Sequence, residues 1–133
     1  MKPDELLARA RRSVASARLL SGAGDPLGAC NRAYYAMFDA ARAALLAAVP
    51  QPQSGSIKTH SGLHTAFSLH LIRSGLIPAS LGKSLNQVDQ IRLIADYSDE
   101  EIDGEKIATA VEQAEQFVDA VAEYVSRPRS LDC

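Results

Sequence analysis

Apolar side chains recur along this chain at the three- and four-residue spacing of α-helices, and no sustained two-residue alternation typical of strands is present. The pattern is clearest toward the C-terminal end, where apolar residues share one helical face and acidic residues share the opposite one. Glycine- and proline-containing breaks separate the periodic segments. The pattern therefore predicts five helices, over residues 3–20, 26–49, 59–73, 78–97 and 105–126.

The breaks between these segments carry recognisable start and stop signals. Asp25 followed by Pro26 predicts an N-cap with proline at the first helical position, and Ser74-Gly75 predicts the end of the third helix. Residues 50–57 (PQPQSGSI) form the longest predicted loop. Because the other connections are short, we predict one all-α domain over residues 1–133, an antiparallel up-and-down bundle of four or five helices.

Composition says what fills the core of such a bundle. Hydrophobic residues make up 47% of the chain and charged residues 23%, which is typical of a folded globular protein. Aromatic residues are only 5% and tryptophan is missing, so Leu, Ile, Val and Ala must form most of the interior. The expected core positions include Leu7, Ala10, Val14, Ala17, Tyr34, Phe38, Ala41, Leu45, Ile107, Ala110, Val111, Ala114, Phe117, Val118, Val121 and Val125.

Charge is nearly balanced overall but unevenly distributed. The net charge of −2 gives no general attraction to nucleic acid or to an anionic membrane. Residues 1–24 are rich in arginine, whereas residues 98–126 hold nine acidic residues against Lys106. The acidic face of the last helix is either simply solvated or a docking surface for a basic partner.

Cysteine content and hydropathy argue against a disulfide-rich, zinc-binding or membrane-spanning protein. Cys30 and Cys133 have neither the spacing of a disulfide framework nor that of a zinc site. The chain begins with a charged helix instead of a secretory signal, and no apolar run is long enough to span a bilayer. We therefore expect a cytoplasmic protein with no membrane segment.

Arg92 breaks the pattern of the fourth helix. Its apolar face is defined by Leu81, Leu85, Val88, Ile91 and Ala95, and Arg92 projects within that face. A guanidinium there must be paired or must line a cleft, because an isolated buried charge is very costly. Asp89 and Asp96 lie three residues before and four after, within reach of it. Arg92 is either part of a buried salt bridge that sets helix register or a phosphate-binding group that Asp96 orients.

Two further polar groups accompany this arginine. Asn31 and Tyr35, with Arg42, form a polar shoulder beside the core face of the second helix. His60 and His64 stand four residues apart, on one helical face, but without the general base and third ligand of a zinc protease. We predict no metal and no cofactor here. His60 is expected to start its helix or to point into a cleft beside Lys58, and His70 to lie on the surface.

Three segments in order resemble the HEPN (higher eukaryotes and prokaryotes nucleotide-binding) superfamily, in particular its small stand-alone prokaryotic branch. They are residues 31–38 (NRAYYAMF), 58–63 (KTHSGL) and 92–97 (RLIADY). The resemblance extends from about residue 5 to residue 125. It implies an up-and-down bundle, usually a homodimer, and frequent pairing with a minimal nucleotidyltransferase antitoxin in a toxin–antitoxin unit.

The resemblance also implies a site. In many such proteins an arginine, followed after four to six residues by a histidine, serves a metal-independent ribonuclease in which a ribose 2′-hydroxyl attacks the adjacent phosphate. Arg92 corresponds to that arginine, but Asp96 and Tyr97 stand where the histidine is expected, and no histidine follows. Asp96 or Tyr97 would have to substitute, or His60 would supply the imidazole from another helix or a second subunit. Tyr97 is also the nearest counterpart of a tyrosine that the partner enzyme modifies with AMP.

Three hypotheses follow. The first is a toxin-type HEPN protein that acts on RNA, with Arg92, Asp96, Tyr97 and His60 as candidate catalytic residues and Asn31, Tyr35 and Lys58 as candidate binding residues. The second is a non-catalytic module that binds a nucleotide or a protein partner through the same cleft. The third is a structural helical adaptor.

Overall fold

The computed structural model describes residues 1–49, 59–97 and 103–127. Within these ranges the chain contains helices and no strand, as the sequence predicts. The elements are α1 (Pro3–Gly22), α2 (Pro26–Ala48), α3 (His60–Phe67), the π-helical turn η1 (Ser68–Ile72), α4 (Ala79–Tyr97) and α5 (Gly104–Ser126). The boundaries lie within two residues of the predicted ones, but the π-helical turn that ends the third helix was not predicted.

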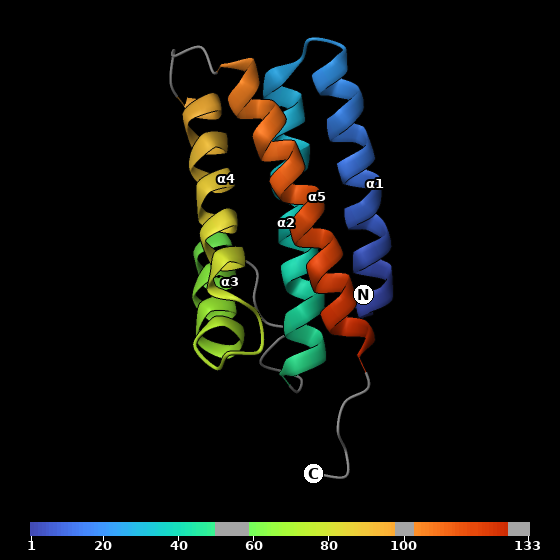
Figure 1. Cartoon of the computed structure of the whole chain (residues 1–133), viewed down its shortest axis with the longest axis vertical. Coiled ribbons are helices and arrows are strands. Elements are labelled where there is room, and N and C mark those ends of the chain that lie inside the picture. Colours follow the sequence, from blue (N-terminus) through green and yellow to red (C-terminus); the bar gives the residue numbers. More distant parts are fainter. Residues whose placement is uncertain (50–58, 98–102, 128–133) are drawn as a thin grey trace.

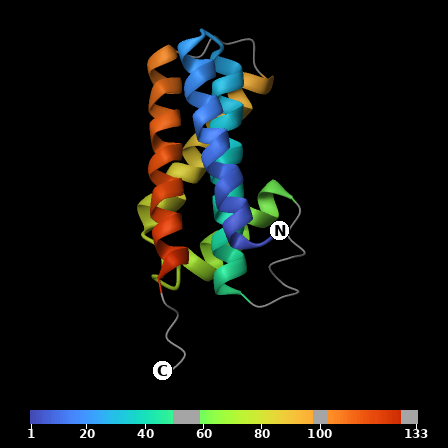
Figure 2. The same ribbon diagram turned by 90° about the vertical axis from the view of Figure 1, so that its right-hand side faces the viewer.

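The long helices alternate in direction (Figure 1). Helix α1 rises, α2 descends, α4 rises and α5 descends, so α5 ends at the end of the bundle at which α1 begins, as a view from the side also shows (Figure 2). The short α3 and η1 lie beside the lower half of α4. The predicted antiparallel bundle is therefore confirmed, with α3 and η1 as a short additional layer.

Local signals set the helix starts. The carboxylate of Asp25 accepts a hydrogen bond from the backbone N–H of Gly28 at 2.9 Å, and Pro26 follows it as predicted. Thr59 caps α3 through a hydrogen bond from Gly62 N–H at 2.9 Å. The turn before α4 needs a positive φ of 81° at Gly75, a conformation that glycine adopts without steric cost.

Helix α2 is the centre of the bundle, since it packs against every other helical element. Small side chains dominate its buried surface, including Ala29, Ala33, Ala36, Ala40, Ala41, Ala43 and Ala44. Short side chains bring neighbouring helix axes close together. The predicted core is confirmed apart from Leu7, Phe38 and Val125, which are only partly buried, and in α1 the fully buried leucine is Leu6.

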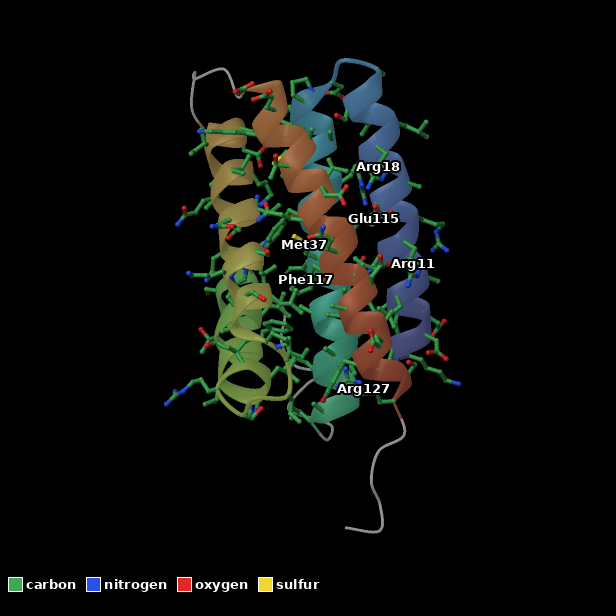
Figure 3. All side chains as sticks on the ribbon, viewed as in Figure 1. Arg11, Arg18, Met37, Glu115, Phe117 and Arg127 are labelled. Carbon is green, nitrogen blue, oxygen red and sulfur yellow. The ribbon has the colours of Figure 1, made fainter. Side chains whose placement is uncertain are left out.

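Ion pairs join α1 to its two neighbours. Arg9 forms two hydrogen bonds of 2.8 Å to Asp39 of α2, whose side chain is 8% exposed. On the other side Arg11 pairs with Asp119 of α5 at 2.8 Å, and Arg18 pairs with Glu112 and Glu115. Figure 3 shows Arg18 and Glu115 facing one another between α1 and α5. Part of the acidic face of α5 is therefore neutralised within the chain, which weakens its interpretation as a docking surface for a basic partner.

Candidate functional site

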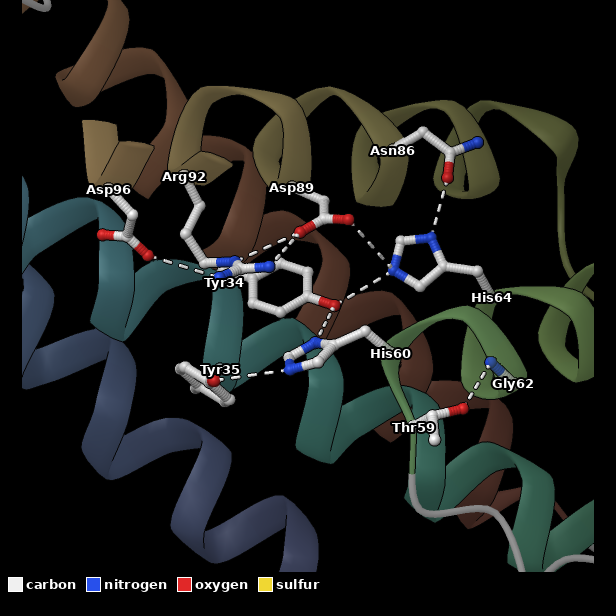
Figure 4. Close-up of polar contacts among 10 residues, drawn as sticks. All are labelled: Tyr34, Tyr35, Thr59, His60, Gly62, His64, Asn86, Asp89, Arg92 and Asp96. Atoms are coloured by element: carbon white, nitrogen blue, oxygen red, sulfur yellow. Dashed lines mark hydrogen bonds and ion pairs between the residues drawn. The ribbon is translucent and has the colours of Figure 1, made fainter. Parts of the chain in front are cut away.

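A groove of about 650 Å³ opens between α2, α3 and α4. It is lined by Tyr35, His60, Ser61, His64, Thr65, Asp89, Arg92 and Leu93. Helices that are distant in sequence thus contribute titratable side chains to one surface, and Figure 4 shows how the polar groups point toward one another. The groove includes the predicted Arg92, Tyr35 and His60.

Arg92 is buried, with only 7% of its surface exposed, as the helical wheel predicts. Its Nε and Nη2 donate to Oδ1 of Asp89 at 3.1 and 2.8 Å, and its Nη1 donates to Oδ2 of Asp96 at 3.3 Å. The guanidinium carbon lies 4.6 Å from the centre of the Tyr34 ring, which is a cation–π arrangement. Two carboxylates and an aromatic face compensate the cost of burying the charge.

Both carboxylates that pair with Arg92 belong to its own helix, α4. Oδ2 of Asp89 also lies 3.8 Å from Nε2 of His64, which connects this group to α3. The contact with the Tyr34 ring joins the guanidinium to α2. The carboxylates therefore hold the arginine in one orientation at the edge of the groove.

Tyr34 connects the two histidines of α3. Its hydroxyl oxygen lies 2.8 Å from Nδ1 of His60 and 3.0 Å from Nε2 of His64, while its ring is buried. His60 also approaches the Tyr35 hydroxyl, with its Nε2 at 3.5 Å. Nδ1 of His64 lies 2.9 Å from the amide oxygen of Asn86, and its Nε2 lies 3.8 Å from Oδ2 of Asp89. Arginine and imidazole groups thus share one site, in which the cation–π contact with Tyr34 and the approach of Asp89 to His64 join two hydrogen-bonded groups.

Burial and charge set the protonation of this site. Burial, aided by the nearby positive charge of Arg92, lowers the pKa of His60 below its ordinary value of 6.5. His60 is therefore neutral near pH 7 and able to accept a proton. Burial also raises the pKa of the Tyr34 hydroxyl, which keeps the phenol protonated. The site combines a neutral base with a fixed cation, a combination suited to an anionic substrate that loses a proton.

We expect the lowered pKa of His60 to make the protein less stable in mild acid. The unfolded chain binds a proton at this residue as the pH falls below 6.5, whereas the folded chain resists until the lower folded-state pKa is reached. The free energy of unfolding should therefore decrease between these two values. Urea unfolding of the wild type and His60→Gln at several pH values measures this, and the variant should show a flatter pH dependence. If the free energy of unfolding changed equally with pH in the two proteins, the lowered pKa of His60 would be contradicted.

The remaining predicted residues are not part of the groove lining. Asn31 is partly buried on α2 but does not line the groove in the described part of the chain. Lys58 and the side chain of Tyr97 lie outside the described residues. Cys30 is buried, and burial raises the pKa of its thiol to about 11, so it is no nucleophile at neutral pH. His70 is exposed, as predicted.

Sequence reasoning missed His64 as a member of the site and assigned Tyr34 to core packing alone. The spacing of His60 and His64 was a usable signal, because residues four apart on a helix share a face. Over residues 1–49, 59–97 and 103–127, no group of three or more His, Cys, Asp or Glu side chains is arranged to hold a metal ion. Across the same ranges no helix has both the length and the apolar character needed to cross a bilayer.

Comparison with known proteins agrees with this architecture. The family model described as HEPN domain matches residues 3–124. The chain belongs to the HEPN family. The resemblance noted for its three sequence segments is thereby confirmed.

Relatives of this HEPN chain are similar over most of their length. A UPF0332 protein of Gloeobacter violaceus is 29% identical over 131 residues, which are 96% of this chain and 100% of the relative. A UPF0332 protein of Thermotoga maritima is 32% identical over 118 residues, 88% of this chain and 86% of the relative. A protein of Methanocaldococcus jannaschii named "Putative toxin" is 29% identical over 116 residues, 87% of this chain and 83% of the relative.

Proposed function

We propose that this HEPN chain is a toxin-type ribonuclease that cleaves RNA through attack of a ribose 2′-hydroxyl on the adjacent phosphate. The name of the Methanocaldococcus relative supports the toxin character. The observation that carries the proposal is that Arg92 and His60, from different helices, line the same groove and contact the same tyrosine. In this proposal His60 takes the part of the histidine that is missing after Arg92.

The two residues have complementary roles in such a reaction. Neutral His60 accepts the proton of the 2′-hydroxyl, and the guanidinium of Arg92 stabilises the negative charge that grows on the phosphate oxygens. A guanidinium has five N–H donors, so its three hydrogen bonds to Asp89 and Asp96 do not exhaust its capacity. Asp96 is then a residue that orients Arg92, and Tyr35 at the groove wall is available to contact a nucleotide base.

The test is cleavage of purified RNA by the wild-type chain and by His60→Gln, in buffer with EDTA. Loss of a positioned acid–base group is expected to reduce the rate about a hundredfold. His70→Gln, at an exposed histidine outside the groove, is the matched control and should keep wild-type activity. Failure of the wild type to cleave total RNA or tRNA, or equal rates for the wild type and His60→Gln, would defeat the catalytic proposal.

A second candidate function is a non-catalytic module that binds a nucleotide or a protein partner. It is favoured by the two carboxylates beside Arg92, because they offset the positive charge that would attract a polyanion. Calorimetric titration with AMP and ATP separates the candidates. Heat of nucleotide binding together with intact RNA would favour the second candidate.

The proposal includes two protein partners. A homodimer and a complex with a minimal nucleotidyltransferase antitoxin are expected, with Tyr97 as the candidate site of modification by AMP. Leu93, 40% exposed on α4, supplies apolar surface in the groove lining for such a partner, and Ile94, also 40% exposed, lines a separate hollow between α4 and α5. Light scattering of the pure chain and co-purification with the product of the neighbouring gene test the two associations.

A further inference from the structure

The hydroxyl of Tyr34 is a hydrogen-bonding link between two imidazole rings. It lies 2.8 Å from Nδ1 of His60 and 3.0 Å from Nε2 of His64. A hydroxyl donates one hydrogen bond and accepts others, so it donates to one ring and accepts from the other. Because Tyr34 is fully buried between α3 and α4, bulk water does not replace these contacts.

Asn86 sets the direction of this hydrogen-bond chain. Its amide oxygen only accepts, so Nδ1 of His64, 2.9 Å away, carries the hydrogen. In a neutral ring Nε2 of His64 then accepts from the Tyr34 hydroxyl. The Tyr34 oxygen in turn accepts from Nδ1–H of His60. The unprotonated nitrogen of His60 is therefore Nε2, on the side of the groove wall formed by Tyr35.

We propose that His60 and His64 form one acid–base unit, in which the Tyr34 hydroxyl passes a proton between the rings and Asp89 stabilises the charge at His64. The inference deepens the proposed ribonuclease function and rests on it for its catalytic part. Within the unit, His60 is the group that meets the substrate. Tyr34 and Asp89 are positioning residues.

The proton transfers balance. Nε2 of His60 takes the proton of the 2′-hydroxyl as the oxygen electron pair forms the new bond to phosphorus. The proton on Nδ1 of His60 moves to the Tyr34 oxygen while the phenolic proton moves to Nε2 of His64. When the bond from phosphorus to the 5′-oxygen breaks, these transfers reverse and Nε2 of His60 gives its proton to the 5′-oxygen. The products are a cyclic phosphate and a 5′-hydroxyl, and the site returns to its starting state.

Charged and polar groups from α2 and α4 surround the histidine pair. Among the described residues, the polar groups that contact the histidine pair are Tyr34 and Tyr35 of α2 and Asn86, Asp89 and Arg92 of α4. Lys83 and Arg73 line neighbouring hollows together with His64. Burial and Arg92 disfavour a positive charge on His60, whereas Asp89 favours one. Oδ2 of Asp89 lies 3.8 Å from Nε2 of His64. The carboxylate of Asp89 is thus placed to compensate a positive charge on either ring.

Nitrogen-15 NMR of the histidine side chains tests the coupling without any substrate. At pH 8 both rings should carry their hydrogen on Nδ1, and on acidification each titration curve should contain two steps, because protonating one ring changes the other. Tyr34→Phe, which keeps the ring that packs against Arg92, should bring the two steps of each curve closer together, because the hydrogen-bonded link is lost while the charge of one ring still acts on the other through space. Tyr35→Phe removes the hydroxyl 3.5 Å from Nε2 of His60 but keeps the link through Tyr34, so each curve should still contain two steps. His64→Gln, at the groove edge, should give a single-step curve for His60 even if Tyr34→Phe folds poorly.

Cleavage kinetics provide the second readout. Tyr34→Phe is expected to lower kcat about tenfold to a hundredfold and to alter the pH–rate profile, with little change in KM. Two-step titrations in a protein that cleaves no RNA would refute the ribonuclease function and leave the coupled pair standing. Single-step titrations in the wild type, or hydrogen on Nε2 of His60, would overturn the coupled pair even if RNA is cleaved.

Discussion

Replacing Arg92 by methionine is expected to reduce RNA cleavage about a thousandfold while the helical bundle stays folded. Methionine has a similar length and suits the apolar face of α4 on which Arg92 lies. It cannot stabilise charge on phosphate oxygens, and that charge grows in the transition state. The loss should therefore lie in kcat more than in KM. Single-turnover cleavage of a labelled RNA measures it, with circular dichroism to verify the fold.

Two further variants make this experiment specific. Arg11→Met removes another salt-bridged arginine, one that pairs with Asp119 far from the groove, and should cleave at the wild-type rate. Arg92→Lys keeps a positive charge but loses the planar fork of donors, so partial activity is expected. Equal activity of Arg92→Met and Arg11→Met would remove Arg92 from the reaction.

Replacing Phe117 by alanine is expected to destabilise the protein by about 3–5 kcal/mol, a large part of the stability of a small domain. Phe117 is fully buried on α5, and its ring centre lies 5.6 Å from that of Phe67 on α3. The core is otherwise built largely from alanine and aliphatic side chains, which cannot rearrange to fill the space of a phenyl ring. Urea unfolding measures the change in the free energy of unfolding.

Val125→Ala is the matched control for this core variant. Val125 lies on the same helix but is only partly buried, so about 1 kcal/mol or less is expected. Because Phe67 ends the helix that carries His60 and His64, Phe117→Ala should also loosen the site. Equal losses for the two variants would show that the ring pair between α3 and α5 contributes no special stability.

Local chemistry made the helices predictable. Asp25-Pro26 and Ser74-Gly75 act through the backbone of their immediate neighbours, so the helix boundaries beside them could be inferred from the chain alone. The buried position of Arg92 and its pairing with Asp89 and Asp96 were equally local, because all three lie within two turns of one helix. Helical periodicity was sufficient for these conclusions.

The imidazoles of the site were harder to infer. His60 and His64 follow Tyr34 by 26 and 30 residues in the chain. They contact it only because α3 packs against α2 at one particular register. Asn31, which periodicity places on the same shoulder of α2 as Tyr35, lies outside the groove lining. Spacing along one helix says which residues share a face, but it does not say which residue of another helix that face meets.

What lies within a few residues along the chain was therefore readable from the amino-acid pattern: the helices, their caps, the apolar faces and the buried guanidinium with its carboxylates. Packing between helices decided the rest, namely that Tyr34 bridges two histidines and that these join Arg92 in one groove. The reason is physical. Backbone hydrogen bonds and caps act over three or four residues, whereas the contact between two helices depends on how all their side chains fit together.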